Sequence, residues 1–417
     1  MNRVRKDSKG RRLKTGETEK KKKAGPGYQG YEYRWMERGK RYSVFAPTLE
    51  ELRNKERHVE KERLFQINHA TAQMTLNQCF DKYMELKRGI KDTSRSHSEF
   101  TYGMYVRENL GKMKIEEIRY SDVKQFYNYL HDERELSLSS VQRIHSDLTG
   151  VFNFAVRDGL ILKNPAIPAM KELNREMKDE IKTVHALTES QQVALEAYLK
   201  EVSFKDGERI RQWYNLSHTA LWTGMRFGEM AALQWEDVDF EKKEIHVRHT
   251  ISVLYEKGGK TKMVINTPKT RTSARTIPML PGVEEALKSE KQYQEQKGLF
   301  CRQPIGELQN FVFLSEKRTA LRGTNYGQQI RRFTQAYNET QKDKENPVLI
   351  ERCTCHMFRH TFATRLMEQG VSPKTIQQIL GHANYMITMN TYVESTNEFT
   401  KLSLDSIAEF EKAVSPA

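Results

Sequence analysis

Hydrophobic positions along this chain follow patterns that divide it into three segments. Near the N-terminus, Tyr31–Met36 and Arg41–Ala46 are short, aromatic-rich stretches joined at Arg38-Gly39-Lys40, which is typical of two strands and a turn. Thr48 then stands where it would cap a charged helix. The first segment, 1–70, is therefore predicted to be a small sheet with one helix.

The second segment, 74–170, carries hydrophobic residues at helical spacing. Thr75 and Gln78 form a capping-box pattern at its start, and Asn164-Pro165 lies near its end. The apolar positions that predict its helices are Leu76, Cys79, Phe80, Tyr83, Met84, then Val123, Phe126, Tyr127, Leu130, then Val141, Ile144, Leu148, Val151, Phe152, Ala155 and Val156. Residues 171–187 are charged and weakly periodic, and we expect them to form a linker.

The third segment, 188–417, opens with a second capping box, Thr188 and Gln191. Three β-rich stretches within it, at 243–255, 261–269 and 273–279, predict an antiparallel meander with Lys269 at a hairpin tip. The predicted fold class is mainly α with small antiparallel β-sheets, in three domains.

The charge of the chain indicates what kind of partner it binds. The net charge is +14 and the sequence pI is about 9.4. Residues 1–41 hold 15 Lys/Arg and 5 Asp/Glu, a balance of +10, which leaves +4 for the rest. Such a basic arm indicates a polyanion such as DNA, and basic and aromatic side chains on the small sheet could lie in a groove. The alternatives are a solvated tail and a module whose aromatics only form its core.

Composition excludes several other classes of protein. The chain has no run of eighteen apolar residues, so we expect no membrane span. The N-terminal MNRVRKDSKGRRLKTG lacks the apolar core of a signal peptide. We therefore expect a cytoplasmic, nucleoid-associated protein of a bacterial cell whose four cysteines are reduced.

Candidate chemistry lies in four motifs of the third segment. Gly224 makes a turn before Arg226 at a helix start, where an arginine beside helix amides can bind phosphate. Lys269 follows in the predicted hairpin. His356 and Arg359 share a helical face, and Gly381-His382 ends a helix ten residues before Tyr392. Taken singly, each motif is also explained by a surface ion pair or a solvated charge.

Together, these side chains suit the attack of a hydroxyl on a phosphodiester. Two arginines can hold the charge that develops on the phosphate oxygens, and histidine and lysine can move protons. A tyrosine can be the covalent nucleophile, which conserves the bond energy. Nothing in the set requires a metal or another cofactor.

The ordered set resembles the active site of tyrosine recombinases, the phage integrase family. The resemblance covers about 230 residues from Thr188, and the motifs TPKTRTSARTIPM and LGHAN and the arm GRRLKTGE are most similar to conjugative-transposon integrases. It implies an arm-binding domain (1–70), a helical core-binding domain (74–170) and a mixed α/β catalytic domain (188–417), the last two closing round DNA. It also implies site-specific integration and excision without metal or ATP.

The resemblance further implies residue roles. Tyr392 would form a 3′-phosphotyrosine link, Arg226 and Arg359 would hold the scissile phosphate, and Lys269 would protonate the leaving 5′ oxygen. His356 would assist proton transfer at Tyr392, His382 would hydrogen-bond the phosphate, and Glu229 would orient a neighbour. The implied partners are double-stranded DNA at core and arm sites, a homotetramer on DNA and an excisionase.

Several alternatives stay open at this point. Cys353, Cys355, His356, His360 and His382 could suggest zinc, although their spacing is not that of a standard finger. Tyr385 is a rival nucleophile. A type IB topoisomerase would share the chemistry, and a non-catalytic DNA-binding regulator would share the charge. The C-terminal stripe of Leu404, Ile407, Phe410 and Val414 could dock on its own domain or on a neighbouring subunit, and the source element could be a phage or a transposon.

Overall fold

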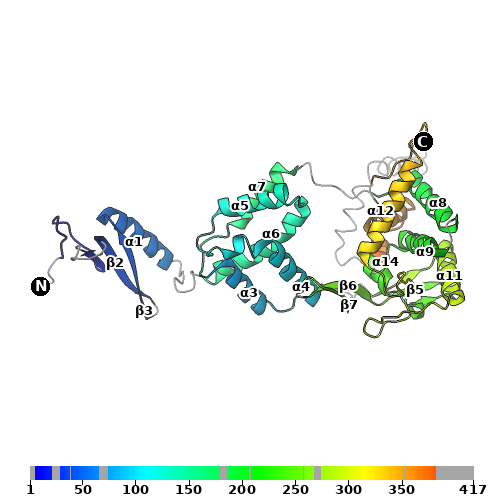
Figure 1. Cartoon of the computed structure of the whole chain (residues 1–417), viewed down its shortest axis with the longest axis horizontal. Coiled ribbons are helices and arrows are strands. Elements are labelled where there is room, and N and C mark those ends of the chain that lie inside the picture. The colour runs from blue at the N-terminus through cyan, green and yellow to red at the C-terminus, as the bar shows by residue number, and fades with distance from the viewer. Residues whose placement is uncertain are drawn as a thin grey trace, which may run out of the picture. The chain divides into compact units, whose positions relative to one another are not determined.

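The computed structural model describes residues 5–20, 29–37, 39–64, 74–178, 186–205, 208–256, 258–266, 274–351 and 353–381 (Figure 1). The chain divides into two compact units, Met1–Ile181 and Lys182–Ala417. Most described residues are helical, and the sheets are small and antiparallel, so the predicted fold class is confirmed. No helix within the described ranges is long and apolar enough to span a membrane.

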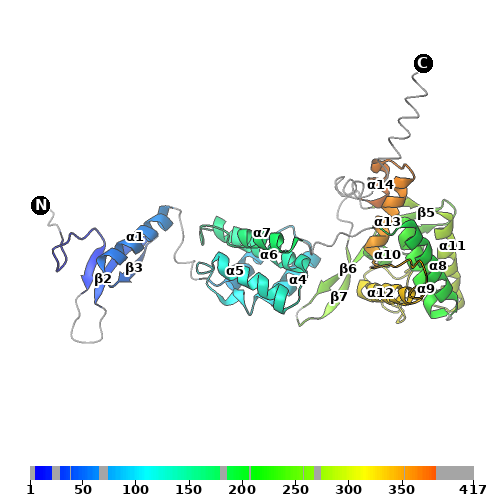
Figure 2. The ribbon, with the colours of Figure 1, turned by 90° about the horizontal axis from the view of Figure 1, so that it is seen from above.

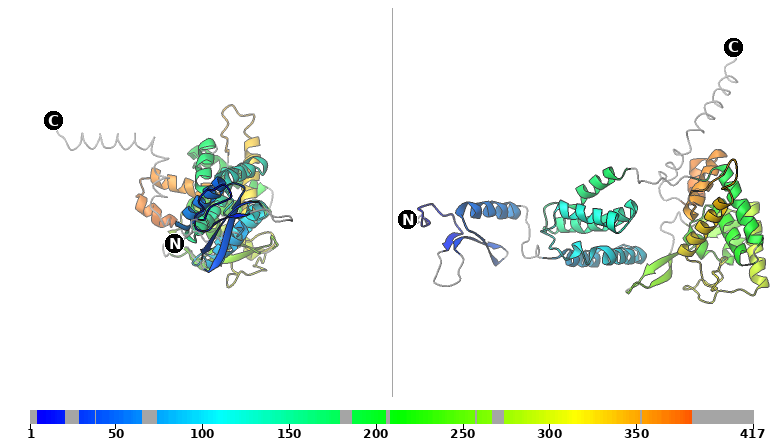
Figure 3. Two further views of the ribbon diagram at one scale, coloured as in Figure 1. Left: turned by 90° about the vertical axis from the view of Figure 1, so that its left-hand side faces the viewer. Right: turned by 45° about the horizontal axis from the view of Figure 1, so that its top comes forward.

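An antiparallel sheet and a helix form the N-terminal module. The sheet has the order β1 (Glu17–Lys20), β2 (Gly30–Glu37), β3 (Lys40–Ala46), and α1 (Leu49–Leu64) lies along one face of it (Figure 3). Thr48 accepts a hydrogen bond from the Glu51 amide at 3.2 Å, as its position predicts. The inner face buries Tyr31, Tyr33 and Trp35 against Leu49, Leu52 and Val59.

Strand β1 is the part of this module that hydrophobic patterning misses. Its sequence is ETEK, which has no apolar alternation. The strand is held instead by Glu17, which is fully buried and whose carboxylate accepts a hydrogen bond from Arg53 Nε of α1 at 3.0 Å. A buried ion pair between elements thus replaces the usual hydrophobic signal.

The helical region folds around one hydrophobic core. Its elements are α3 (Leu76–Leu86), α4 (Asp92–Thr101), α5 (Tyr120–Asn128), α6 (Leu138–Arg157) and α7 (Ala166–Glu176), with π-helical turns at Tyr102–Val106 and Tyr129–Glu133. The predicted capping box at α3 is present: Thr75 accepts from the Gln78 amide, and the Gln78 side chain accepts from the Thr75 amide. Each of the predicted helical sets contributes buried residues to the core.

Helix α7 extends into the segment that we expected to be a linker from residue 171. Its apolar face, which includes Ala169, Met170 and Leu173, is buried in the core of the helical region. In the sequence AIPAMKELNRE, Leu173 is the only apolar residue after position 170, so the part that lies in the predicted linker shows no helical pattern of apolar residues. The first part of the predicted linker is therefore helix.

The C-terminal unit packs its helices around α9 (Glu208–Thr223). This helix contacts α8 (Glu189–Lys205), α11 (Pro281–Gln296) and α13 (Cys355–Glu368) (Figure 2). The remaining elements are α10 (Phe227–Ala232), α12 (Gly323–Glu339), α14 (Pro373–Leu380), β4 (Val238–Asp239), β5 (Glu244–Val247), β6 (Thr250–Tyr255), β7 (Thr261–Asn266) and β8 (Arg275–Pro278).

The predicted meander is wrong in its strand order. Strand β8 pairs with β5 in a sheet of order β4-β5-β8, and β6 and β7 form a separate hairpin. The stretch 243–255, which was expected to be one strand, is interrupted at Arg248-His249. There the Arg248 side chain forms an ion pair with buried Asp237, at 3.0 Å. Ile245 and Ile277 then face each other in the core, which draws β8 to β5.

Leu187, near the start of the C-terminal unit, is hydrogen-bonded to α13. The amide of buried Leu187 donates to Thr361 Oγ1 at 2.9 Å, and its carbonyl accepts from Arg365 Nη2 at 2.7 Å. Arg365 Nε also donates to Gln192 of α8 at 2.9 Å. The end of the interdomain segment is thus fixed to the middle of α13, and the capping box of Thr188 and Gln191 forms as predicted.

Candidate active site

The turn Thr223–Arg226 places an arginine at the start of α10. Gly224 adopts a left-handed conformation, with φ +61°, and Arg226 is the residue that precedes the first turn of the helix. Glu229 Oε2 accepts the Arg226 amide at 2.9 Å, and Glu229 Oε1 accepts Arg226 Nη1 at 2.8 Å. One carboxylate therefore holds both the backbone and the side chain of Arg226.

The same carboxylate binds a second arginine, Arg275 of β8. Arg275 Nη2 lies 2.9 Å from Glu229 Oε2, and the two side chains are only 5% and 6% exposed. Arg275 Nε also donates to the Ile379 carbonyl at 2.6 Å. Arg275 is a residue of this cluster that the sequence prediction missed.

The third arginine is Arg359, on α13. Thr354 caps this helix by accepting the Met357 amide at 3.1 Å, and Arg359 is 3% exposed. Arg359 Nη1 donates to the Gly224 carbonyl at 2.8 Å and Nη2 to the Leu380 carbonyl at 2.6 Å. The side chain thus joins the Gly224 turn to the end of α14.

The end of α14 is where the arginines meet. The carbonyls of Ile379, Leu380 and Gly381 accept from Arg275, Arg359 and Arg226 respectively, the last at 3.3 Å. These are carbonyls that a helix end leaves without intrahelical partners, and they carry its partial negative charge. Gly381 ends the helix in a left-handed conformation, with φ +66°. Three segments far apart in sequence are therefore joined one residue before His382.

The pKa shifts follow from this crowding of charge. Burial alone would raise the pKa of Glu229, but the charges and hydrogen bonds of Arg275 and Arg226 outweigh it and lower that pKa. Burial, and then the charge of Arg226, lower the pKa of Arg359 to about 9. Its guanidinium therefore stays charged at neutral pH.

His356 lies one turn before Arg359 on α13, and its ring meets His360 edge to face, with centroids 5.1 Å apart. Burial lowers the pKa of His356, and His360, Arg359 and Arg226 lower it further. The ring is therefore mainly neutral at pH 7. A neutral imidazole beside an arginine cluster is able to accept a proton.

Three guanidinium groups around one carboxylate leave an excess of positive charge, which suits an anion. Arg275 and Arg359 are buried, whereas the Arg226 side chain is 39% exposed and is open to a ligand. Arginine holds phosphate through paired hydrogen bonds and keeps its charge. The arrangement can therefore bind a phosphate whose charge increases during a reaction.

Three of the six predicted site residues, Arg226, His356 and Arg359, are described, and the structure brings them together. Lys269, His382 and Tyr392 lie outside the described residues, as do Tyr385 and the C-terminal stripe. The burial of Arg275 could have been predicted from the sequence, because it lies two residues before Ile277 and so on the same inward face of the strand. An arginine on such a face needs a buried carboxylate.

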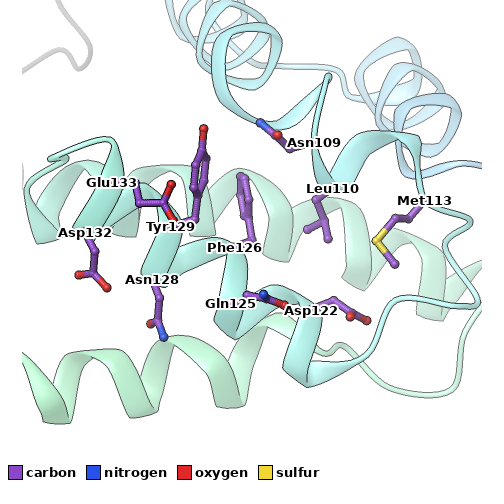
Figure 4. A pocket seen from close by; sticks show the side chains of 10 residues that line it. All are labelled: Asn109, Leu110, Met113, Asp122, Gln125, Phe126, Asn128, Tyr129, Asp132 and Glu133. Atoms are coloured by element: carbon purple, nitrogen blue, oxygen red, sulfur yellow. The ribbon is translucent and has the colours of Figure 1, made fainter.

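A separate pocket of about 440 Å³ lies in the helical region (Figure 4). Leu110 and Phe126 line it together with the carboxylates of Asp122, Asp132 and Glu133. Carboxylates repel phosphate, so this pocket does not suit a DNA backbone. Within the described part of the chain, no three His, Cys, Asp or Glu side chains are grouped to hold a metal.

Comparison with known proteins gives matches to both units. The phage integrase family model matches residues 175–398, more than half of the chain. The phage integrase SAM-like domain model matches residues 75–172. Over 410 residues, the chain is 27% identical to the transposase from transposon Tn916 of Enterococcus faecalis and to that from transposon Tn1545 of Streptococcus pneumoniae. Each alignment covers 95% of both chains.

Solved structures are similar as well. The Tn1549 transposon integrase in complex with a circular intermediate DNA aligns with a TM-score of 0.66 and 26% identity, over 80% of this chain and 99% of that one. A lambda integrase tetramer bound to a Holliday junction aligns with a TM-score of 0.51 and 19% identity, over 87% of this chain and 92% of that one, which shows a likeness of fold.

Proposed function

Because the chain belongs to the phage integrase family and is a tyrosine recombinase acting on DNA, we propose that it cuts and rejoins DNA through a covalent bond to Tyr392. The hydroxyl oxygen of Tyr392 attacks the scissile phosphorus, and the bond to the 5′ oxygen breaks. The products are a 3′-phosphotyrosine and a free 5′-hydroxyl. Attack by a 5′-hydroxyl of another strand reverses the step, so no ATP is consumed.

The observation that supports this proposal is the convergence of Arg226 and Arg359 on the carbonyls of Gly381 and Leu380. Both positive charges are fixed before any substrate binds, so little reorganisation is needed as charge grows on the phosphate. In the proposed mechanism Arg226 and Arg359 hold the non-bridging oxygens. Glu229 keeps the side chain of Arg226 in place.

Proton transfer is assigned to the remaining members of the set. His356, neutral at pH 7 because of its lowered pKa, accepts the proton of Tyr392. Lys269 gives a proton to the leaving 5′ oxygen, and His382, which follows Gly381, hydrogen-bonds the phosphate. Each of these roles rests on the family motif, and for His356 also on its place beside the arginine cluster.

The proposed substrate is double-stranded DNA at the ends of a mobile element. The Tn1549 integrase was solved with transposon right end DNA and with circular intermediate DNA, which favours a conjugative transposon over a phage. Recombination of two duplexes cuts four strands, and each chain supplies one Tyr392. The working assembly is therefore a homotetramer on core sites, with an excisionase as a further partner.

The N-terminal sheet is the proposed reader of arm sites. Arg34, Arg41 and Phe45 lie on one face of it, and Tyr33 and Trp35 face the opposite way, toward α1. Phe45 is 42% exposed, and an aromatic beside arginines suits a groove of DNA. Three strands present a surface of the kind that fits the major groove.

The test uses nicked DNA that carries the ends of the host element, incubated in EDTA and separated on a denaturing gel. The nick lets the short cleaved strand leave, so a covalent complex accumulates. Tyr392→Phe removes the complex, and Tyr385→Phe, the matched control, retains it. A complex that persists in Tyr392→Phe, or none from wild-type protein that binds this DNA, contradicts the proposal.

A further inference from the structure

Arg275 is a buried arginine for which the proposed mechanism has no role. It lies at the first residue of β8, six residues after Lys269 in the chain. Its side chain is 5% exposed, so it does not present an open face to DNA as Arg226 does. Among the described residues, it contacts groups that belong to the proposed active site.

Two of these contacts point to different parts of the site. Nη2 binds Glu229 Oε2 at 2.9 Å, and the other oxygen of that carboxylate binds Arg226 at 2.8 Å. Nε binds the Ile379 carbonyl at 2.6 Å, three residues before His382. Arg275 therefore shares the Glu229 carboxylate with Arg226, and it is hydrogen-bonded directly to the end of α14.

On this geometry we propose that Arg275 is a positioning residue that holds β8, the Glu229–Arg226 pair and the end of α14 in one arrangement. The inference rests on the proposed function, because it takes Arg226 as catalytic, together with Lys269 and His382, which precede β8 and follow α14 in the sequence.

Lysine cannot make this connection. Glu229 and the Ile379 carbonyl, two acceptors of Arg275 among the described residues, lie on different elements and accept from two nitrogens of one planar group. A lysine ammonium is a single nitrogen on a flexible stem and lacks the fork. Arg275→Lys therefore keeps the positive charge beside Glu229 but gives up one of the two attachments.

The experiment measures single-turnover cleavage of the nicked DNA with protein in excess. For Arg275→Lys we expect a rate constant about 100-fold lower, because a small displacement of catalytic groups has an effect of this order. The dissociation constant for the same DNA, from gel shift, should stay within about twofold of wild type, since buried Arg275 does not bind DNA. While folded protein still saturates the DNA, an unfolded fraction leaves the single-turnover rate constant unchanged, so the rate constant reports positioning.

Arg248→Lys is the matched control. Arg248 also pairs with a buried carboxylate, Asp237, at 3.0 Å, but none of its contacts described above reaches the arginine cluster. The Arg248→Lys variant should cleave DNA at the wild-type rate. A double variant of Arg275→Lys with Glu229→Gln should be little slower than Glu229→Gln alone, because Arg275 acts on Arg226 through the Glu229 carboxylate.

Three results would overturn the inference: an unchanged rate constant in Arg275→Lys, an equal loss in Arg248→Lys, or independent, multiplying losses in the double variant. These differ from a failure of the proposed function. If wild-type protein forms no Tyr392-dependent complex, the proposed function is contradicted and the inference falls with it. If wild type forms the complex and Arg275→Lys forms it equally fast, only the inference is contradicted.

Discussion

At the scale of residues, Arg275 is joined to partners that are far from it in sequence: Glu229 lies 46 residues before it and Ile379 lies 104 residues after it. The strand face that Arg275 shares with Ile277 indicates its burial, but no motif indicates these two partners. Arg226, His356 and Arg359 were predicted because their motifs occur together in order. The spacing of a motif records neighbours along a helix but not contacts made by folding.

Gly224 gives a residue-scale prediction. Its φ is +61°, and an added Cβ would lie 2.6 Å from Leu380 Cδ2 and 2.7 Å from Phe362 Cδ1. Gly224→Ala should therefore lower the free energy of unfolding by about 2–4 kcal/mol through strain and overpacking. Gly370→Ala is the control, because φ is +73° and nothing lies within 4 Å. It should cost about 1–2 kcal/mol, from the backbone alone. Urea denaturation measures both, and equal losses would show that the Gly224 turn is not tightly packed.

His356 gives a prediction of pH dependence. Its pKa is lowered below 6.5 by burial and by the charges around it, and its neutral form is the proposed base. The rate of covalent-complex formation should stay level from pH 8 to about 6.5 and decline below that, as the ring takes up a proton. The rate constant is measured by single turnover across this range. A decline that is already complete at pH 7 would rule out His356 as the base.

Glu229 gives a second prediction of pH dependence, in this case for stability. Its folded pKa is lowered, so its contribution to stability is present above the unfolded value, 4.5, and is lost as pH falls through the folded pKa. Between about pH 5 and pH 3, thermal unfolding of wild type should shift to lower temperature more than that of Glu229→Gln. The same shift in both proteins would mean that Glu229 has an unperturbed carboxylate.

At the scale of elements, helices and capping boxes were predictable and strand partners were not. Thr75 with Gln78 and Thr188 with Gln191 form because each pair lies within one turn. Strand β8 pairs with β5 across the intervening β6–β7 hairpin, a choice set by the burial of Ile245 and Ile277. Strand β1 depends on an ion pair with α1, which no periodic pattern encodes.

Helix α7 gives the element-scale prediction. Leu173 is fully buried, whereas Ile167 on the same helix is 53% exposed. Leu173→Ala should destabilise the helical region by about 2–5 kcal/mol, through lost burial and a cavity. Ile167→Ala, the control, should change its stability by less than about 0.5 kcal/mol. Calorimetry of the full chain measures the transition. Two variants with equal melting behaviour would mean that α7 does not pack on the core of its region.

At the scale of the whole molecule, charge is distributed unequally along the chain. Residues 1–41 carry +10 of the net +14. Binding to DNA by phosphate contacts releases counterions, so the affinity should fall steeply with salt. With six to ten contacts, the loss is about 10³–10⁵-fold between 50 and 200 mM. Gel shifts across this range measure it. A flat response would argue against extensive backbone contact, including the expected closure of the last two domains round DNA.

The attachment of Leu187 to Thr361 and Arg365 has a mechanical consequence. A force applied to the chain just before Leu187 would therefore act on α13, the helix of His356 and Arg359. The same helix thus carries both the point where the chain enters this unit and two of the proposed catalytic residues, His356 and Arg359. Residues inserted before Ala186 would leave the hydrogen bonds of Leu187 to α13 intact.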